Sequence, residues 1–170
     1  MDSFESKSEI RQRVISQRPQ PSTGLAANLV RLAFELDANV IASYQPLANE
    51  PDVAEFNLWV TSMGKTLLLP RIEGENLVFA EGELEIGSHG IYEPTGSPHD
   101  LAEAQLILLP ALAVDKNGNR LGKGKGFYDR ALAQVQGIAK YAVVFDSEIL
   151  DSIPTESHDV WVTGAVTPTA

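Results

Sequence analysis

Glycine and lysine alternate over residues 122–126, which read GKGKG. The three glycines let a ligand approach the backbone amides closely, and Lys123 and Lys125 place ammonium groups beside those amides. Such a set of donors is suited to a chain of phosphate groups. Taken alone, the segment could also be a solvated turn whose glycines serve only the backbone. The flanking residues, GNRL before it and FYDRAL after it, favour phosphate binding.

The chain as a whole is acidic, with 13 Lys and Arg against 23 Asp and Glu and a formal net charge of -10. This charge repels nucleic acid, membrane surfaces and nucleotides. Five basic residues nevertheless fall within fifteen positions around the glycine segment: Lys116, Arg120, Lys123, Lys125 and Arg130. One basic loop predicts a small anionic ligand, since nucleic-acid binding usually needs a longer basic face. We therefore expect neither nucleic acid nor a membrane as a partner.

Several other chemistries lack support in the sequence. The chain has no cysteine, which excludes disulfides, thiolate metal sites and a cysteine nucleophile, and its three scattered histidines argue against zinc. The glycine segment has neither the spacing of a Walker A loop nor that of a dinucleotide fingerprint. The first residues lack an apolar signal core, and no apolar run approaches the roughly 20 residues that span a bilayer. A cytoplasmic protein is expected.

Helix and strand patterns alternate along the chain and must position this loop. Helical spacing of apolar residues predicts a first helix that includes Phe4, Ile10 and Val14 and ends before Pro19, and further helices over 22–36, 49–63 and 127–136. Apolar runs predict strands at 40–44, 66–70, 106–110, 140–145 and in the closing 160–167. Residues 73–100 read as loops around short strand-like pieces. Strands that are apolar on both faces predict a mostly parallel sheet covered by helices, in one domain over residues 1–170.

The block PALAVDKNGNRLGKGKGFYDRAL resembles the signature of the 5-formyltetrahydrofolate cyclo-ligase family, also called methenyltetrahydrofolate synthetase. Matches in the same order include Lys7 and Arg11, YQPLANEPDV after the first strand, LPR at 69–71, GIYEP at 90–94 and PTESHD at 154–159. The resemblance spans nearly the whole chain and implies a three-layer α/β/α, Rossmann-like fold. It also implies cyclisation of 5-formyltetrahydrofolate, with or without a polyglutamate tail, to 5,10-methenyltetrahydrofolate. This reaction depends on ATP and magnesium, passes through a phosphorylated formyl group, releases ADP and phosphate, and is expected of a monomer.

The resemblance also assigns residues to the nucleotide. Lys7 and Arg11 lie four positions apart and so share one face of a helix, which without the resemblance would be taken as a solvated face. The implied catalytic residues are Arg120, Lys125 and Tyr128, although Tyr128 could instead pack in the core. The implied ATP-binding residues are Lys7, Arg11, Arg120, Leu121, Gly122, Lys123, Gly124, Lys125, Gly126, Phe127 and Tyr128.

Acidic and aromatic residues complete the implied site. Asp129 corresponds to a family carboxylate that helps to hold Mg²⁺, but it could also stabilise a helix N-terminus. The implied substrate-binding residues are Glu50, Val53, Arg71, Tyr92, Glu93 and Tyr128. For Glu50 the alternative is helix capping, for Arg71 a structural salt bridge and for Glu93 a turn residue before Pro94. His158 and Asp159 resemble a late family pair, although a lone His-Asp pair is more often structural.

The chain departs from the family pattern at three places. Phe127 replaces the first of two tyrosines, Val53 stands near a usual threonine, and the closing VWVTGAVTP lacks an acidic residue. The first two departures leave open a non-catalytic ATP-binding paralogue that has lost folate turnover. A related small-molecule phosphotransferase is a second alternative, because a scaffold and a phosphate loop do not determine the acceptor.

Overall fold

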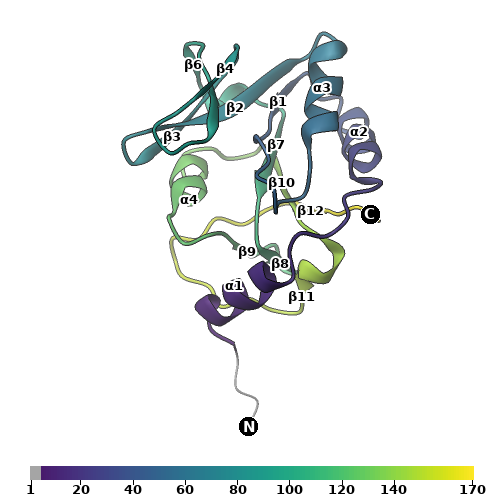
Figure 1. Ribbon diagram of the computed structural model, residues 1–170, viewed down its shortest axis with the longest axis vertical. Coiled ribbons are helices and arrows are strands. Elements are labelled where there is room, and N and C mark those ends of the chain that lie inside the picture. The colour runs from purple at the N-terminus through teal and green to yellow at the C-terminus, as the bar shows by residue number, and fades with distance from the viewer. Residues whose placement is uncertain (1–4) are drawn as a thin grey trace.

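The computed structural model describes residues 5–170, which are organised around a seven-stranded sheet (Figure 1). The strand order is β12-β10-β7-β1-β2-β3-β6. Its strands are β1 (Val40–Ala42), β2 (Thr66–Glu73), β3 (Asn76–Ala80), β6 (Pro98–His99), β7 (Leu106–Pro110), β10 (Ala139–Val143) and β12 (Gly164–Val166). The strands from β12 to β2 pair in parallel, whereas β2, β3 and β6 pair antiparallel.

The parallel strands form a doubly wound sheet. Their spatial order β2-β1-β7-β10-β12 means that the chain first adds β2 on one side of β1 and then adds the later strands on the other side. The direction of winding therefore reverses between β1 and β7. In open α/β sheets, ligands bind outside the carboxyl ends of the strands at such a reversal. The topology thus predicts a ligand-binding site at the residues that follow β1 and β7.

Helices cover both faces of the sheet, as Figure 1 shows. Leu106 and Leu108 of β7 pack with α2 (Leu25–Glu35) and α3 (Ala54–Ser62) in one core. Ile107 and Leu109 belong to a second core with α4 (Phe127–Leu132). Successive side chains of a strand point to opposite faces, so the unbroken apolar run of β7 fits a strand buried on both sides. The predicted α/β class with a mostly parallel sheet is confirmed.

A smaller sheet joins the first helix to the main body. It has the order β11-β8-β9, with β8 (Ala113–Asp115), β9 (Arg120–Leu121) and β11 (Ile149–Leu150). Helix α1 (Lys7–Ser16) packs Ile10 and Val14 against this sheet in a third apolar cluster. Lys7 and Arg11 lie beside this apolar face on the helix, at i, i+3 and i, i+7 spacings from Ile10 and Val14, so the packing of α1 also fixes them relative to the β8–β9 turn.

The segment predicted as loops around short strands contains four strands. It contributes β3 and β6 to the main sheet, and β4 (Leu84–Ile86) and β5 (Tyr92–Pro94) form a separate antiparallel pair. Short 3₁₀ turns, η1 (Leu101–Glu103) and η2 (Asp146–Glu148), precede β7 and β11. No helix among the described residues is long and apolar enough to cross a membrane.

Several predicted bounds need correction. The predicted helix 49–63 begins only at Ala54, because the Tyr44 hydroxyl donates to the Pro51 carbonyl and holds the preceding residues as a loop. The predicted helix 127–136 ends at Leu132, and the strand predicted at 66–70 continues to Glu73. The predicted first helix is observed over Lys7–Ser16, and its apolar residue Phe4 lies outside the described residues.

Candidate active site

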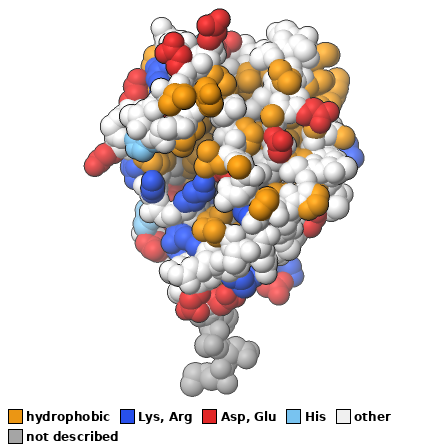
Figure 2. All heavy atoms as spheres, in the orientation of Figure 1, with side chains coloured by type: hydrophobic (Ala, Val, Ile, Leu, Met, Phe, Trp, Pro, Cys, Tyr) orange, Lys and Arg blue, Asp and Glu red, His pale blue; other side chains and the backbone are white. Residues whose placement is uncertain are grey.

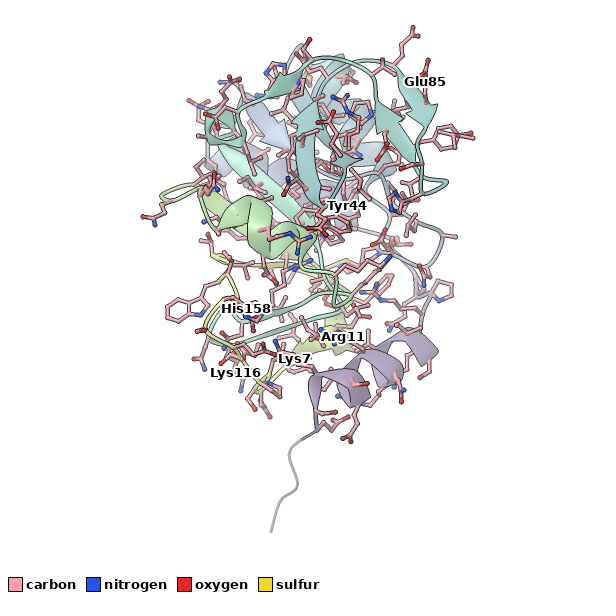
Figure 3. All side chains as sticks on the ribbon, turned by 90° about the vertical axis from the view of Figure 1, so that its left-hand side faces the viewer. Lys7, Arg11, Tyr44, Glu85, Lys116 and His158 are labelled. Atoms are coloured by element: carbon pink, nitrogen blue, oxygen red, sulfur yellow. The ribbon has the colours of Figure 1, made fainter. Side chains whose placement is uncertain are left out.

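A cavity of about 1020 Å³ opens at the carboxyl ends of β1, β2 and β7. Its wall combines α1, the loop after β1, the glycine loop with the start of α4, and residues 154–159. Figure 3 shows Lys7 and Arg11 pointing from α1 toward the interior, where Tyr44 lies. Figure 2 shows Lys and Arg side chains gathered left of centre on one face, with acidic side chains toward both ends. The cavity thus provides a locally basic site on an acidic protein.

The glycine loop takes a conformation that suits glycine. Gly124 and Gly126 have φ angles of +97° and +73°, in the left-handed region that other residues rarely adopt. A Cβ on Gly126 would lie 2.7 Å from Nη1 of Arg130, which donates to the Lys125 carbonyl at 3.0 Å, so a side chain there would displace this contact. Arg11 reaches the loop from α1 and donates from Nε to the Gly122 carbonyl at 2.8 Å. The loop is therefore fixed at both ends, by Arg11 and by Arg130.

Arg120 lies half-buried in the wall and keeps an unpaired positive charge. Its Nε and Nη2 donate to the Pro110 carbonyl at 2.9 and 2.5 Å, and its guanidinium lies 5.2 Å from the centre of the Tyr128 ring. No carboxylate among residues 5–170 forms a salt bridge with it. Burial lowers the pKa of Arg120, but an arginine stays protonated in a protein. Such a charge is available for an anionic ligand.

Tyr128 is held neutral by the same surroundings. Burial raises the pKa of its phenol, Arg120 opposes that rise and Glu50 adds to it. Its ring also meets Phe79 of β3 edge-on at 6.4 Å. Tyr128 therefore both packs in the second core and lines the cavity, so the two interpretations of this residue are compatible.

Lys7 joins α1 to the last part of the chain. Its Nζ lies 2.8 Å from Asp159 Oδ2 and 3.4 Å from Glu156 Oε1. Burial alone would lower the pKa of Lys7, but the hydrogen bond and the charge of Asp159 outweigh burial and leave the pKa raised. His158 Nε2 lies 3.5 Å from both carboxylates. The residues of PTESHD thus form one wall of the cavity with α1.

Glu50 lies on another part of the wall and is largely buried. Its Oε1 accepts from the Leu47 amide at 2.8 Å, and its Oε2 lies 3.6 Å from Lys123 Nζ. This carboxylate therefore stabilises its own loop and faces the glycine loop. It does not cap α3, because α3 begins later, at Ala54.

Asp129 lines the cavity at the start of α4 and has few partners of its own. Its Oδ1 accepts from the Val160 amide over a long 3.4 Å. Nowhere in residues 5–170 do three or more acidic, histidine or cysteine side chains gather around a common point for a metal. A hard cation at Asp129 would therefore take most of its oxygen ligands from bound phosphates and water, as Mg²⁺ often does.

Most of the residues expected in the site come together in this cavity. The cavity wall contains Lys7, Arg11, Glu50, Glu93, Asp129, His158, Asp159 and every residue from Arg120 to Tyr128. Glu93 accepts from the Ile72 amide at 2.7 Å, so it links β5 to β2 while facing the cavity. It is a pocket carboxylate and not only a turn residue.

Three residues expected at the substrate do not line the cavity. Val53 is fully buried in the core beneath α2 and α3. Arg71 donates to the Pro94 and Gly96 carbonyls and pairs with Glu73, which is the structural alternative. Tyr92 is 52% exposed, because strand alternation turns its neighbours Ile91 and Glu93 toward the cavity and Tyr92 away.

Sequence reasoning missed other lining residues. Tyr44, whose ring is buried, begins the YQPLANEPDV block and could have been noticed from its position directly after the first strand. Arg18 carries no such signal, because its contacts are with residues far along the chain. The remaining apolar wall comes from Ile72, Leu77, Ile91, Pro110, Ala111 and Leu112.

Comparison with known proteins agrees with this arrangement. The model of the 5-formyltetrahydrofolate cyclo-ligase family matches residues 5–168. The chain belongs to this family. A 5-formyltetrahydrofolate cyclo-ligase of Mycolicibacterium smegmatis is 32% identical over 96% of this chain and 94% of the relative. One of Escherichia coli is 27% identical over 93% of this chain and 94% of its own.

Solved structures of the family have the same fold. The 5,10-methenyltetrahydrofolate synthetase of Aquifex aeolicus superimposes with a TM-score of 0.80 at 29% identity, covering 96% of this chain and 90% of that one. The synthetase of Mycoplasma pneumoniae gives a TM-score of 0.78 at 19% identity, covering 96% and 99%, and supports the fold alone. The predicted family, and with it the prediction of a cyclo-ligase enzyme, is confirmed.

Proposed function

We propose that this protein catalyses the ATP-dependent closure of 5-formyltetrahydrofolate to 5,10-methenyltetrahydrofolate. One observation carries the proposal. A single cavity unites the basic glycine loop, at which a nucleotide can bind, with the buried carboxylate of Glu50, at which a pterin can bind. A reaction between ATP and a folate needs a nucleotide-binding surface and a pterin-binding surface in the same cavity.

The chemistry requires activation of the formyl oxygen. Transfer of the γ-phosphoryl group to this oxygen breaks the bond to ADP and makes the formyl carbon electrophilic. The N10 amine then attacks that carbon, phosphate leaves with the oxygen, and loss of the N10 proton gives the methenyl cation. The protein contributes by aligning two substrates and by stabilising the charge of the transferred group.

The basic wall suits the nucleotide. Loop amides between Gly122 and Gly126, with Lys123 and Lys125, would hold the phosphate chain, while Arg120 brings an unbalanced charge to the transferred group. Arg11 stabilises the loop by donating a hydrogen bond to the Gly122 carbonyl. We assign the catalytic roles to Arg120 and Lys125, with Tyr128 as a wall that orients Arg120.

The carboxylates suit the remaining ligands. Glu50 would accept the amino and ring N–H donors of the pterin. Asp129 fits Mg²⁺, since its carboxylate faces the cavity with one long hydrogen bond from the protein, and the ion when bound would neutralise phosphate charge. One chain supplies all of these groups, so the proposed site needs no residue from a second copy.

The departures from the family pattern fit catalysis. Phe127 lies 5.3 Å beneath the Arg130 guanidinium, so its ring packs without needing a hydroxyl. Val53 lies in the apolar core and does not line the cavity, so a hydroxyl at this position would not contact a ligand there. These positions therefore give no support to a paralogue that has lost folate turnover.

The test mixes purified protein with 5-formyltetrahydrofolate, ATP and magnesium and follows the near-ultraviolet absorbance of the methenyl product. Product that needs both ATP and magnesium is the expected result. A folded sample that binds ATP yet forms no product would contradict the proposal and favour the ATP-binding paralogue. ATP consumption with another acceptor would instead indicate a different phosphotransferase.

A further inference from the structure

Arg18, which follows α1, forms a buried ion pair with Glu148 of η2. Nε and Nη2 donate to the two carboxylate oxygens at 2.8 and 2.7 Å, and both side chains are only 2% exposed. Glu148 also accepts from the Phe145 amide, and the guanidinium lies 5.5 Å from the Phe145 ring centre. The positive charge of Arg18 is thus balanced inside the protein.

Stability alone is a weak reason for this pair. Removing two charges from water costs as much as their attraction usually returns, and apolar replacements are often at least as stable. Arg18 is moreover part of the cavity wall. Nη2 makes a second bond, to the Ala111 carbonyl at 2.7 Å, but no acceptor in residues 5–170 is hydrogen-bonded to Nη1. The two N–H groups of Nη1 are therefore the part of Arg18 that a ligand can use.

Arg18 differs from Arg120 in the ligand that it suits. Arg120 is bonded to the uncharged Pro110 carbonyl and retains its charge for an anion. Arg18 is already neutralised by a bidentate carboxylate, so a phosphate gains little there. A neutralised donor in a buried wall favours an uncharged acceptor, such as a carbonyl oxygen.

The acceptor can be identified from the neighbours. Arg18, Tyr44 and Glu50 all line the cavity, and the Tyr44 hydroxyl donates to the carbonyl of Pro51, the residue after Glu50. The pKa of Tyr44 agrees with this arrangement, since burial raises it, Glu50 raises it further and Arg18 lowers it. A 2-amino-4-oxopterin presents an amino group, a ring N–H and a carbonyl along one edge. A carboxylate matches the two donors, and an arginine N–H matches the carbonyl.

We propose that Arg18 determines specificity for the pterin by donating from Nη1 to its 4-oxo oxygen, beside Glu50. This inference rests on the proposed function, since it assumes that a folate occupies the cavity. It predicts rejection of the 4-amino-4-deoxy analogue, which places a donor against Nη1 and also lacks the ring N–H that Glu50 accepts, so the share due to Arg18 is the part that Arg18 variants lose. A site that hydrogen-bonds one group discriminates strongly against an analogue that cannot complete the bond.

The test is calorimetric titration of the full chain with 5-formyltetrahydrofolate and with its 4-amino-4-deoxy analogue, at a pH where both rings are uncharged. Wild type should bind the 4-oxo compound at least about tenfold more tightly. Arg18→Lys keeps a charge opposite Glu148 but lacks the forked nitrogens, and Arg18→Met with Glu148→Gln removes both charges. In each, affinity for the 4-oxo compound should fall about 10- to 100-fold and the preference should shrink, with ATP affinity unchanged. The part of the preference that remains comes from Glu50, which loses the ring N–H donor in the analogue.

The matched control is the exposed pair formed by Arg13 and Glu5, also at α1. Arg13→Met with Glu5→Gln should leave both affinities unchanged. Folded Arg18 variants that retain the wild-type preference, or a wild type without one, would overturn the inference while leaving product formation intact. A wild type that binds no folate would overturn the proposed function as well. Circular dichroism identifies a variant that does not fold. If the double variant does not fold, the inference is tested by the affinities of the Arg18→Lys variant and by the ratio of the wild-type affinities for the two compounds.

Discussion

Asp129 is held more loosely than Glu50, Glu93 and Asp159, with a 3.4 Å hydrogen bond from the Val160 amide against contacts of 2.7–2.8 Å at the other three. Asp129→Asn keeps the size and this acceptor but removes the charge that a magnesium ion needs. We expect turnover to fall by about 100-fold, with thermal stability unchanged. Turnover measured against magnesium concentration checks this prediction. Asp151→Asn, at an exposed carboxylate paired with Lys116, is the control, and equal turnover of the two variants would contradict the metal role.

Lys7 and Asp159 give a pH dependence whose sign follows from their pKa shifts. Burial alone would raise the pKa of Asp159, but the hydrogen bonds from Lys7 and the Glu156 amide, together with the charges of Lys7 and His158, outweigh burial and lower the pKa below 3.8. Its stabilisation is present above that value and is lost as pH falls through the lower, folded pKa. The pKa of Lys7 is raised above 10.5, so its stabilisation is present below that value and is lost as pH rises through the higher, folded pKa.

Lys7→Met should therefore lower the free energy of unfolding by about 1 kcal/mol near neutral pH and by much less at pH 3, after allowance for solvent screening. Denaturant unfolding of wild type and variant at both pH values, without nucleotide, measures the difference. Lys116→Met removes a fully exposed pair and should have no effect on the unfolding midpoint. A loss that is equal at both pH values would mean that apolar packing of the lysine stem, not the ion pair, stabilises the contact.

At the scale of elements, alanine variants of two matched glycines, Gly126 and Gly137, test whether the glycine loop binds phosphate or is an ordinary turn. Gly126 and Gly137 have φ angles of +73° and +77°, but only a Cβ on Gly126 meets a neighbour, Nη1 of Arg130. Both alanine variants should lose about 1 kcal/mol of stability from the backbone conformation. Gly126→Ala should in addition raise the KM for ATP about tenfold or more, since the Arg130 guanidinium that donates to the Lys125 carbonyl must move away from the loop. An unchanged KM in a folded Gly126→Ala variant would argue against phosphate binding by the loop.

Local sequence determined some elements well and others poorly. Strand β7 matches its predicted bounds, because the apolar run of residues 106–109 ends at a proline. The predicted start of α3 was wrong because hydrogen bonds outside the helix hold the two preceding residues, from Tyr44 to the Pro51 carbonyl and from the Asp52 amide to Ser22, which lies 30 positions earlier. The glycine loop and Glu50 lie in continuous sequence motifs, so the family resemblance located them. Arg18 has no such local pattern, because its hydrogen-bond partners lie 93 and 130 positions away.

At the scale of the whole molecule, an ion pair connects the glycine loop to Glu50, and so the proposed nucleotide site to the proposed folate site. Lys123 Nζ lies 3.6 Å from Glu50 Oε2 across the cavity. A folate that occupies Glu50 releases Lys123 for phosphate, so each substrate should tighten the binding of the other by the same factor, about fivefold or more. Calorimetry with a non-hydrolysable ATP analogue, with and without 5-formyltetrahydrofolate, measures that factor. Lys123→Gln should abolish it, Lys116→Gln should preserve it, and a factor of one in wild type would disprove the coupling.

The contact of Lys7 with Glu156 and Asp159 closes the cavity with segments from opposite ends of the described chain. During synthesis the early helices and strands leave the ribosome first and can begin to fold. The wall formed by residues 154–159 does not yet exist at that stage. A growing chain therefore has no complete site, and substrate can stabilise only molecules whose synthesis has passed Asp159. In the cell, ligand would thus protect finished enzyme from proteolysis while leaving prematurely terminated chains open to degradation.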